Sequence, residues 1–224
     1  MRWHAVKTQR GIKCIALKDF SPYGNPRLPD GPPGEHLPDR LATETAKFIQ
    51  ENRQKPFLAY LSFYSVHTPL MAREDLQKKY EAKAKALTNS EPKWGQERER
   101  QVRLVQDHAI YAGMVEAMDQ AVGKVLKAID DAGVSSNTIV VFTSDNGGLS
   151  TSEGSPTSNL PLRGGKGWAY EGGVREPLIV YAPGVTKAGS VSDTVMTVLI
   201  FIRCCWNWPG CPSCPNSIRT ARVS

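Results

Sequence analysis

The sequence has no uninterrupted apolar run of the roughly 18 residues or more that a membrane-spanning helix needs, so we predict no membrane span. The first residues carry positive charge but lack the continuous apolar stretch of a secretory signal peptide, and we predict none. No Gly-Lys-Ser/Thr triplet stands at the spacing of a phosphate-binding P-loop, which excludes that class of nucleotide site. Cysteine is scarce until the end of the chain, since four of the five cysteines lie in residues 199–224.

The composition permits one compact domain. The chain has 224 residues, of which 40% are hydrophobic and 22% are charged, so it can bury a sizeable core. The formal net charge is +6, but the basic residues are dispersed and glutamates alternate with them over residues 74–100. Because no nucleic-acid-binding motif accompanies this charge, we expect no nucleic-acid partner. A basic balance suits a small anionic substrate equally well.

Oxygen-bearing side chains follow an apolar run at residues 139–143. This run has the length and β-branched composition of a buried strand, and it leads into Asp145 and Asn146, followed by paired glycines. Ligands of α/β proteins collect at the carboxyl ends of parallel strands. A carboxylate and a carboxamide there suit a hard cation such as Ca²⁺ or Mg²⁺. Taken alone, Asp-Asn-Gly-Gly is also ordinary turn chemistry.

A glycine-rich segment with three cations follows. Arg163, Lys166 and Arg175 stand among Gly164, Gly165, Gly167, Gly172 and Gly173. Cationic side chains on a backbone that can approach closely make a plausible clamp for a tetrahedral oxyanion. The alternative is a flexible glycine loop without a ligand.

A histidine follows a second apolar run. Residues 57–63 have strand length and are preceded by a proline, and His67 stands just beyond them. The histidine therefore falls past the carboxyl end of a predicted strand, which makes it a candidate site residue. A loop histidine with a purely structural role is the alternative.

Helices are predicted between these strands. A short amphipathic pattern covers residues 43–53, and residues 72–103 are typical of a solvated helix and loop. Over residues 105–131 apolar side chains recur at helical spacing, and Gly133 provides a stop; these side chains are Val115, Met118, Val122, Val125 and Ile129. With a further strand at residues 178–181, the order of elements predicts an α/β fold with a parallel sheet and crossover helices.

Three segments together resemble the sulfatase family: YSVHTP at residues 64–69, IVVFTSDNGG at residues 139–148, and LRGGKGWAYEGGVREP at residues 162–177. Members of this family hydrolyse sulfate esters within the alkaline-phosphatase-like fold. The resemblance therefore implies an α/β fold with a mostly parallel sheet flanked by helices, which is incomplete in this sequence.

The resemblance also implies residue roles. His67 and Lys166 would bind sulfate oxygens and act as catalytic residues, while Asp145 and Asn146 would be metal ligands, for Ca²⁺ in preference to Mg²⁺. Arg163 either reaches the anion or pairs with Glu171 or Glu176 and holds the loop, and we favour the structural role. The implied partners are a sulfated small molecule or a sulfated carbohydrate. Family members are often exported, periplasmic or lysosomal.

The nucleophile of the family is missing from this sequence. Sulfatases use a Cys/Ser-x-Pro-x-Arg motif whose first residue is matured to formylglycine, and no such motif occurs here. Without an activated nucleophile, covalent catalysis has no starting point. We therefore expect an inactive fragment of a sulfuric ester hydrolase. The alternatives are a non-catalytic anion-binding domain and a phosphodiesterase or phosphomutase of the same superfamily.

These observations divide the chain into three parts. Residues 1–19 have no resemblance that we can place, residues 20–198 resemble part of a sulfatase catalytic domain, and residues 199–224 differ in composition. A reading frame moved back by one nucleotide can turn this tail into an apolar, sulfatase-like helix, so we interpret it as a frameshift product. The alternatives are a zinc cluster and a disulfide knot built from Cys204, Cys205, Cys211 and Cys214.

Overall fold

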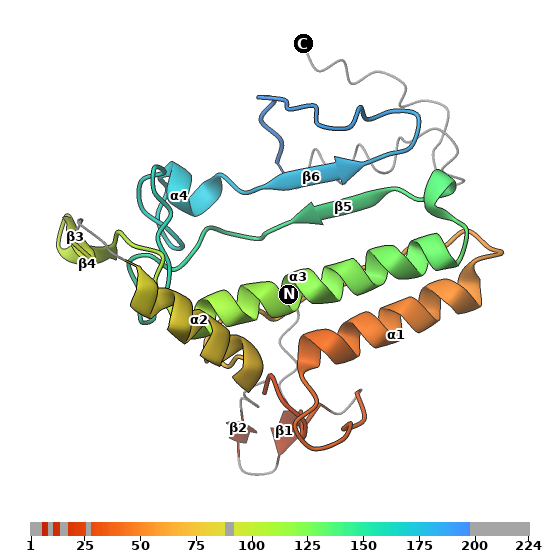
Figure 1. Ribbon diagram of the computed structural model, residues 1–224, viewed down its shortest axis with the longest axis horizontal. Coiled ribbons are helices and arrows are strands. Elements are labelled where there is room, and N and C mark those ends of the chain that lie inside the picture. Colours follow the sequence, from red (N-terminus) through yellow and green to blue (C-terminus); the bar gives the residue numbers. More distant parts are fainter. Residues whose placement is uncertain (1–5, 9–10, 14–17, 26–27, 88–91, 198–224) are drawn as a thin grey trace. The chain divides into compact units, whose positions relative to one another are not determined.

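The computed structural model describes residues 6–8, 11–13, 18–25, 28–87 and 92–197. The chain forms two compact units, residues 1–183 and residues 184–224. All helices and strands of the described residues lie in the first unit (Figure 1). The cysteine-rich tail, with its predicted frameshift and the alternative cysteine sites, lies outside the described residues.

The first unit is built on helices α1 (Leu37–Asn52), α2 (Glu74–Ala86) and α3 (Ala109–Asp131). The long helix α3 packs against both α1 and α2 (Figure 1). Helix α1 begins earlier than the predicted start at residue 43, because Pro38 occupies its first turn. The fixed φ of proline suits that position, where its missing N–H leaves no hydrogen bond unmade.

The buried face of α3 differs from the predicted one. It consists of Gly113, Met114, Ala117, Ala121 and Ile129. Ile129 was predicted correctly, but Val115 is 40% exposed and lies off this face. The prediction considered only large apolar side chains. In the structure, alanines and a glycine form much of the contact of α3 with its neighbours, because small residues let helices approach closely. At the end of α3 the predicted glycine stop is confirmed, since Gly133 has a φ of +70° and donates to Asp130 O at 2.9 Å.

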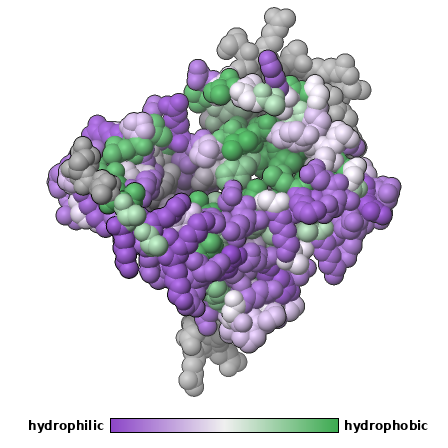
Figure 2. All heavy atoms as spheres, in the orientation of Figure 1, coloured by the Kyte–Doolittle hydropathy of each residue, from purple (hydrophilic) through white to green (hydrophobic). Residues whose placement is uncertain are grey.

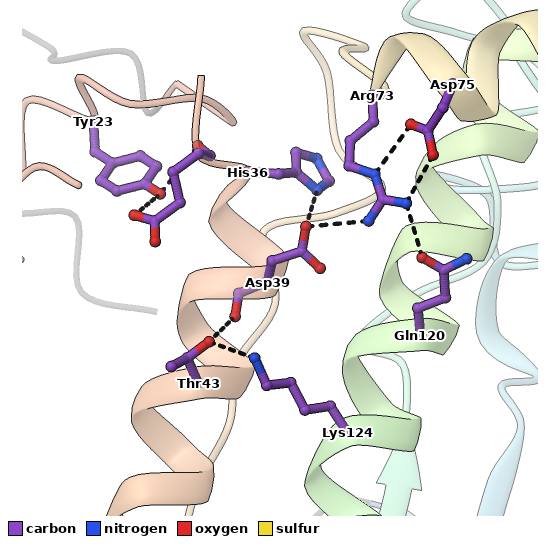
Figure 3. A network of polar contacts seen from close by, with 9 residues as sticks. Tyr23, His36, Asp39, Thr43, Arg73, Asp75, Gln120 and Lys124 are labelled. Atoms are coloured by element: carbon purple, nitrogen blue, oxygen red, sulfur yellow. Dashed lines mark hydrogen bonds and ion pairs between the residues drawn. The ribbon is translucent and has the colours of Figure 1, made fainter. Parts of the chain in front are cut away.

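A polar network joins the three helices (Figure 3). Arg73, which precedes α2, donates to Asp39 Oδ2 of α1 at 3.2 Å and to Gln120 Oε1 of α3 at 3.0 Å. Lys124 of α3 donates to Thr43 Oγ1 of α1 at 2.7 Å. These bonds orient the helices relative to one another at the rim of their apolar contact.

The expected parallel sheet is not seen in the part of the chain that the structure describes. Strands β5 (Val140–Thr143) and β6 (Leu178–Tyr181) instead pair antiparallel, with Thr143 opposite Leu178. The chain leaves β5 at Thr143 and re-enters the sheet at the same end after residues 144–177. Parallel neighbours require a crossover that returns to the opposite end, which this connection does not make.

The remaining strands form antiparallel hairpins: β1 (Val6–Thr8) with β2 (Gly11–Lys13), and β3 (Trp94–Glu97) with β4 (Arg100–Arg103). The strand predicted at residues 57–63 is not formed as a strand in the structure. Leu58 and Tyr60 within it are each 89% exposed. A strand is defined by backbone hydrogen bonds to a neighbour, and no described strand pairs with this segment.

Hydrophobic residues gather over β5 and β6, whereas α1 and α2 present mainly hydrophilic atoms on the same face (Figure 2). Ile179 is 62% exposed and Tyr181 is 51% exposed. An isolated two-stranded ribbon with an exposed apolar face gains little stability of its own. The helices, and not this ribbon, therefore provide most of the buried core. Among the described residues, no helix combines the length and the apolar character needed to cross a bilayer.

Met114 tests the importance of the helical core. Its side chain is fully buried, so Met114→Ala should lower the free energy of unfolding by about 2–5 kcal/mol. Val115→Ala on the exposed face is the matched control and should cost much less. Chemical denaturation of both variants measures the difference. Equal losses would contradict the assignment of the buried face.

Asp19 is buried without a compensating partner. Its residue is 0% exposed, and neither carboxylate oxygen has a hydrogen-bond partner among the described residues. Burial raises the pKa of Asp19 from 3.8 to about 6. The raised pKa means that the folded state holds this proton more tightly than the unfolded state. Protonated Asp19 therefore contributes to the free energy of unfolding below pH 3.8, and this contribution is lost as the pH rises through about 6.

Asp19→Asn should therefore raise the free energy of unfolding at pH 7.5 by about 1–3 kcal/mol, because it removes the buried charge. At pH 4 the variant and the parent should differ little. Urea unfolding at the two pH values measures this, with Asp119→Asn on the exposed face of α3 as the control. A pH-independent difference would show that the buried charge of Asp19 is not the cause.

Candidate anion site

The structure brings together two of the predicted site residues from distant parts of the sequence. Lys166 Nζ lies 2.9 Å from His67 Nε2, although 99 positions separate the residues. His67 stands in the loop before α2, and Lys166 stands in the glycine-rich connection between β5 and β6. Their side chains are 41% and 26% exposed, respectively. The pair is therefore accessible to a small ligand from solvent.

The contacts of His67 define its tautomer. The Nδ1 atom lies 2.8 Å from the main-chain oxygen of Thr68, and a carbonyl oxygen can only accept. The proton must therefore be on Nδ1, which leaves the Nε2 lone pair to accept from the Lys166 ammonium group. Tyr64 supports this arrangement by donating its hydroxyl to the same Thr68 oxygen at 3.0 Å. Burial, as the largest cause, raises the pKa of Tyr64, so the hydroxyl stays protonated.

A third residue, Glu153, contacts the pair. One carboxylate oxygen lies 3.5 Å from Lys166 Nζ, and the other lies 3.9 Å from His67 Nε2 and accepts from Thr68 Oγ1 at 3.1 Å. Sequence reasoning missed this residue. Its neighbours Ser152 and Gly154 indicate an exposed turn, where a glutamate is ordinary, and no local pattern reveals a contact with a residue 85 positions away.

Lys166 is positioned by contacts between main-chain segments. Its amide donates to Gly148 O at 3.1 Å, and the Gly147 amide donates to Gly173 O at 3.2 Å. A Cβ atom added at Gly147 would lie 1.8 Å from Gly172 O, and one at Gly165 would lie 2.4 Å from Gly148 O. These glycines are therefore needed because the segment after β5 and the glycine-rich segment touch through their backbones. We call this arrangement the glycine interlock.

The other two predicted cations have partners elsewhere. Arg163 donates two hydrogen bonds to the Glu97 carboxylate of β3, at 2.7 and 3.0 Å, and its guanidinium lies 4.0 Å from the centroid of the Tyr170 ring. The predicted pairing of Arg163 with Glu171 or Glu176 is therefore wrong. Glu171 instead pairs with Arg175 at 3.2 Å, one helical turn away. Lys166 is the cation of the segment that contacts His67.

Asp145 and Asn146 follow β5, as predicted from the sequence. Asn146 Nδ2 donates to Asp145 Oδ1 at 2.8 Å, and both side chains are accessible to solvent. The pair connects to the anion site through the backbone, because Lys166 N bonds to Gly148 O two residues beyond Asn146. The acidic and basic parts of the predicted site therefore lie on segments that pack together.

The surroundings of Asp145 favour a cation. Glu176 has an oxygen, Oε1, that is buried without a hydrogen-bond partner among the described residues. Burial and, second, the charge of Asp145 raise the pKa of Glu176, so the two carboxyl groups repel each other. The donor set fits a hard cation chemically but supplies only part of the six to eight oxygens that Ca²⁺ takes. In the described ranges, no group of three or more His, Cys, Asp or Glu residues has the arrangement of a metal site.

The arrangement can bind an oxyanion. The Lys166 ammonium group and the Thr68 hydroxyl are donors that contact the two different oxygens of one carboxylate, that of Glu153. Sulfate and phosphate oxygens accept the same kind of charge-assisted hydrogen bonds as a carboxylate. An anion with several acceptor oxygens could therefore accept from both donors.

Comparison with known proteins identifies a family model and several relatives that match most of this chain. The family model described as Sulfatase matches residues 6–203. A "Sulfatase" from Formosa agariphila is 41% identical over 188 residues, which cover 80% of this chain and 30% of that protein. Human steryl-sulfatase is 31% identical over 189 residues, covering 82% of this chain and 27% of the enzyme. The chain thus spans about a third or less of the curated relatives it matches.

Two solved structures are also similar to this chain. The crystal structure of Ps i-CgsB aligns with a TM-score of 0.57 at 30% sequence identity, covering 77% of this chain and 34% of that chain. The complex of Ps i-CgsB with k-i-k-neocarrahexaose aligns with a TM-score of 0.54, covering 75% of this chain and 33% of that one.

Gly147 tests the glycine interlock. Gly147→Ala forces a side chain against the main-chain oxygen of Gly172 and should lower the free energy of unfolding by about 1–3 kcal/mol. Gly123→Ala is the matched control, since nothing lies within 4 Å of an added Cβ in the middle of α3. The control should stabilise the chain by up to about 1 kcal/mol through helix propensity. Thermal or urea unfolding measures both variants. A change in the free energy of unfolding that has the same sign in both would contradict the interlock.

Proposed function

We propose that this chain, which belongs to the sulfatase family, carries the sulfate-binding part of a sulfuric ester hydrolase. The observation that carries the proposal is the contact of 2.9 Å between Lys166 Nζ and His67 Nε2. Both residues stand in segments that resemble the family, and the fold brings them into one accessible site. Because the chain spans only 30% of its Formosa relative, hydrolysis is proposed only for a protein that also contains the rest of the catalytic domain.

Lys166 and His67 have different roles in the proposed site: Lys166 supplies positive charge, and His67 supplies an oriented ring nitrogen. The Lys166 ammonium group would bind a sulfate oxygen and offset the negative charge that develops on the departing alcohol oxygen. His67, oriented through Nδ1 by the Thr68 carbonyl, would turn Nε2 toward the same sulfate group. Because the Nε2 lone pair accepts from Lys166 in this structure, Nε2 must take up a proton before it can donate to a sulfate oxygen.

Asp145 and Asn146 would hold the Ca²⁺ ion that the family implies, with ligands additional to those described. When bound, that ion would supply positive charge to the sulfate oxygens. The unsatisfied oxygen of Glu176 and its repulsion by Asp145 support a cation in this region. The family nucleophile, formylglycine, has no matching motif in this sequence, so this chain by itself should bind sulfate without turning over a sulfate ester.

A sulfated carbohydrate is the substrate class that we favour. Ps i-CgsB, which aligns at 30% identity, has been crystallised with a neocarrahexaose. In this chain Trp168 and Tyr170 stack with ring centroids 5.9 Å apart on the same segment as Lys166. The Arg163 guanidinium lies over the Tyr170 ring, so this cluster combines aromatic rings with a cation, which suits the apolar faces and anionic groups of a sulfated sugar.

Lys166→Ala tests the proposed function. Titration calorimetry with inorganic sulfate should show binding by the parent chain and a loss of about tenfold or more in the variant, because a charge-assisted hydrogen bond disappears. Lys85→Ala, an exposed lysine of α2, is the control and should leave the affinity unchanged.

An aryl sulfate provides the second readout, and no turnover is expected from the purified chain. Turnover that Lys166→Ala abolishes would contradict the inactivity of the chain. Equal sulfate affinity of Lys166→Ala and the parent would contradict the placement of the sulfate site.

A further inference from the structure

Glu153 stands on a turn whose backbone has an unusual conformation. Glu153, Gly154 and Ser155 have φ angles of +51°, +86° and +43°, and the Ser155 amide donates to Ser152 O at 2.9 Å. A glutamate and a serine rarely adopt positive φ, because the Cβ atom crowds the backbone. The surrounding structure must therefore impose the conformation of this turn.

Arg103 holds the base of the turn. Its residue is only 3% exposed, and its guanidinium donates to Ser155 O at 3.1 Å and forms an ion pair with Asp107. The Arg103 amide also donates to Ser150 O at 2.9 Å, on the other side of the turn. The buried arginine thus anchors the turn, and the turn presents the Glu153 side chain to the anion site.

The Glu153 carboxylate makes the contacts that a bound sulfate would make. It reaches the Lys166 ammonium group at 3.5 Å and accepts from the Thr68 hydroxyl at 3.1 Å. Carboxylate and sulfate oxygens accept the same charge-assisted bonds, so the two groups compete for the same donors. The side chain is 42% exposed, which leaves it free to swing toward solvent when a ligand enters.

We propose that Glu153 is a specificity-determining residue that acts as an internal competitor for the Lys166–His67 site. This inference rests on the proposed function, because it assumes that sulfate binds at Lys166. An entering sulfate must displace the carboxylate or share the ammonium group with it. The negative charge of Glu153 repels a bound anion, and this repulsion grows with the charge of the anion. Glu153 therefore selects against small, highly charged anions.

The decisive variant is Glu153→Gln, which keeps the size of the side chain but removes its charge. Calorimetry with inorganic sulfate should show about two- to fivefold tighter binding, the range that an exposed ion pair contributes. Glu171→Gln is the matched control, since Glu171 pairs with Arg175 in α4 (Glu171–Val174).

If Glu153 instead holds Lys166 in position, Glu153→Gln should weaken sulfate binding. Sulfate affinity that is unchanged or weaker in Glu153→Gln would overturn the competitor role. The double variant Glu153→Gln/Lys166→Ala completes a double-mutant cycle. In the Lys166→Ala background, Glu153→Gln should no longer increase the sulfate affinity. A gain that persists without Lys166 would also overturn the proposal, because the competition would then not be for Lys166.

The single variants separate this inference from the proposed function. If Lys166→Ala loses sulfate binding while Glu153→Gln behaves as the parent, only the role of Glu153 is wrong. If Lys166→Ala binds sulfate as the parent does, the proposed site itself is wrong. If neither the parent nor Glu153→Gln binds sulfate, both proposals fail. Matching circular dichroism spectra and melting temperatures of the variants exclude misfolding as the cause of any loss.

Discussion

The glycine interlock is the constraint on which the site depends. The segment after β5 and the segment before β6 touch through their main chains, with Gly147 bonded to Gly173 and Gly148 accepting from Lys166. A Cβ atom has no room at Gly147 or Gly165. The interlock therefore fixes the Lys166 backbone relative to Asp145 and Asn146. A side chain as flexible as lysine can serve a site only when its backbone is held in this way.

Electrostatic contacts then join residues from two connections, the one between α1 and α2 and the one between β5 and α4. His67 is oriented by a carbonyl, Lys166 donates to its free nitrogen, and Glu153 balances the lysine charge. Each group is partly exposed, so solvent screens the individual interactions and none of them contributes much to folding stability. Under the function that we propose, their arrangement serves ligand binding. The helices and the Arg73 network provide the stable base instead.

The sequence predicted α3 and the strands β5 and β6 from clear local patterns, whereas α1 and α2 had weaker signals that located them only roughly. It did not predict the pairing of the two strands. Apolar runs at residues 139–143 and 178–181 have the same appearance in parallel and antiparallel sheets, and only the path of residues 144–177 decides the direction. Likewise, the exposed position of Val115 follows from small residues on the opposite face of α3, which an apolar count overlooks.

By itself, the sequence determined the family and the chemical types of the site residues: a histidine and an oxygen-rich pair after apolar runs, and a lysine among glycines. These features are local, so a short window of sequence contains them. The tertiary structure decided which of the cations meets the histidine and that Glu153 joins them. Arg163, Lys166 and Arg175 are alike in the sequence, but their partners Glu97, His67 and Glu171 are chosen by the fold. Contacts between residues 85 or 99 positions apart arise from packing, and no local pattern encodes them.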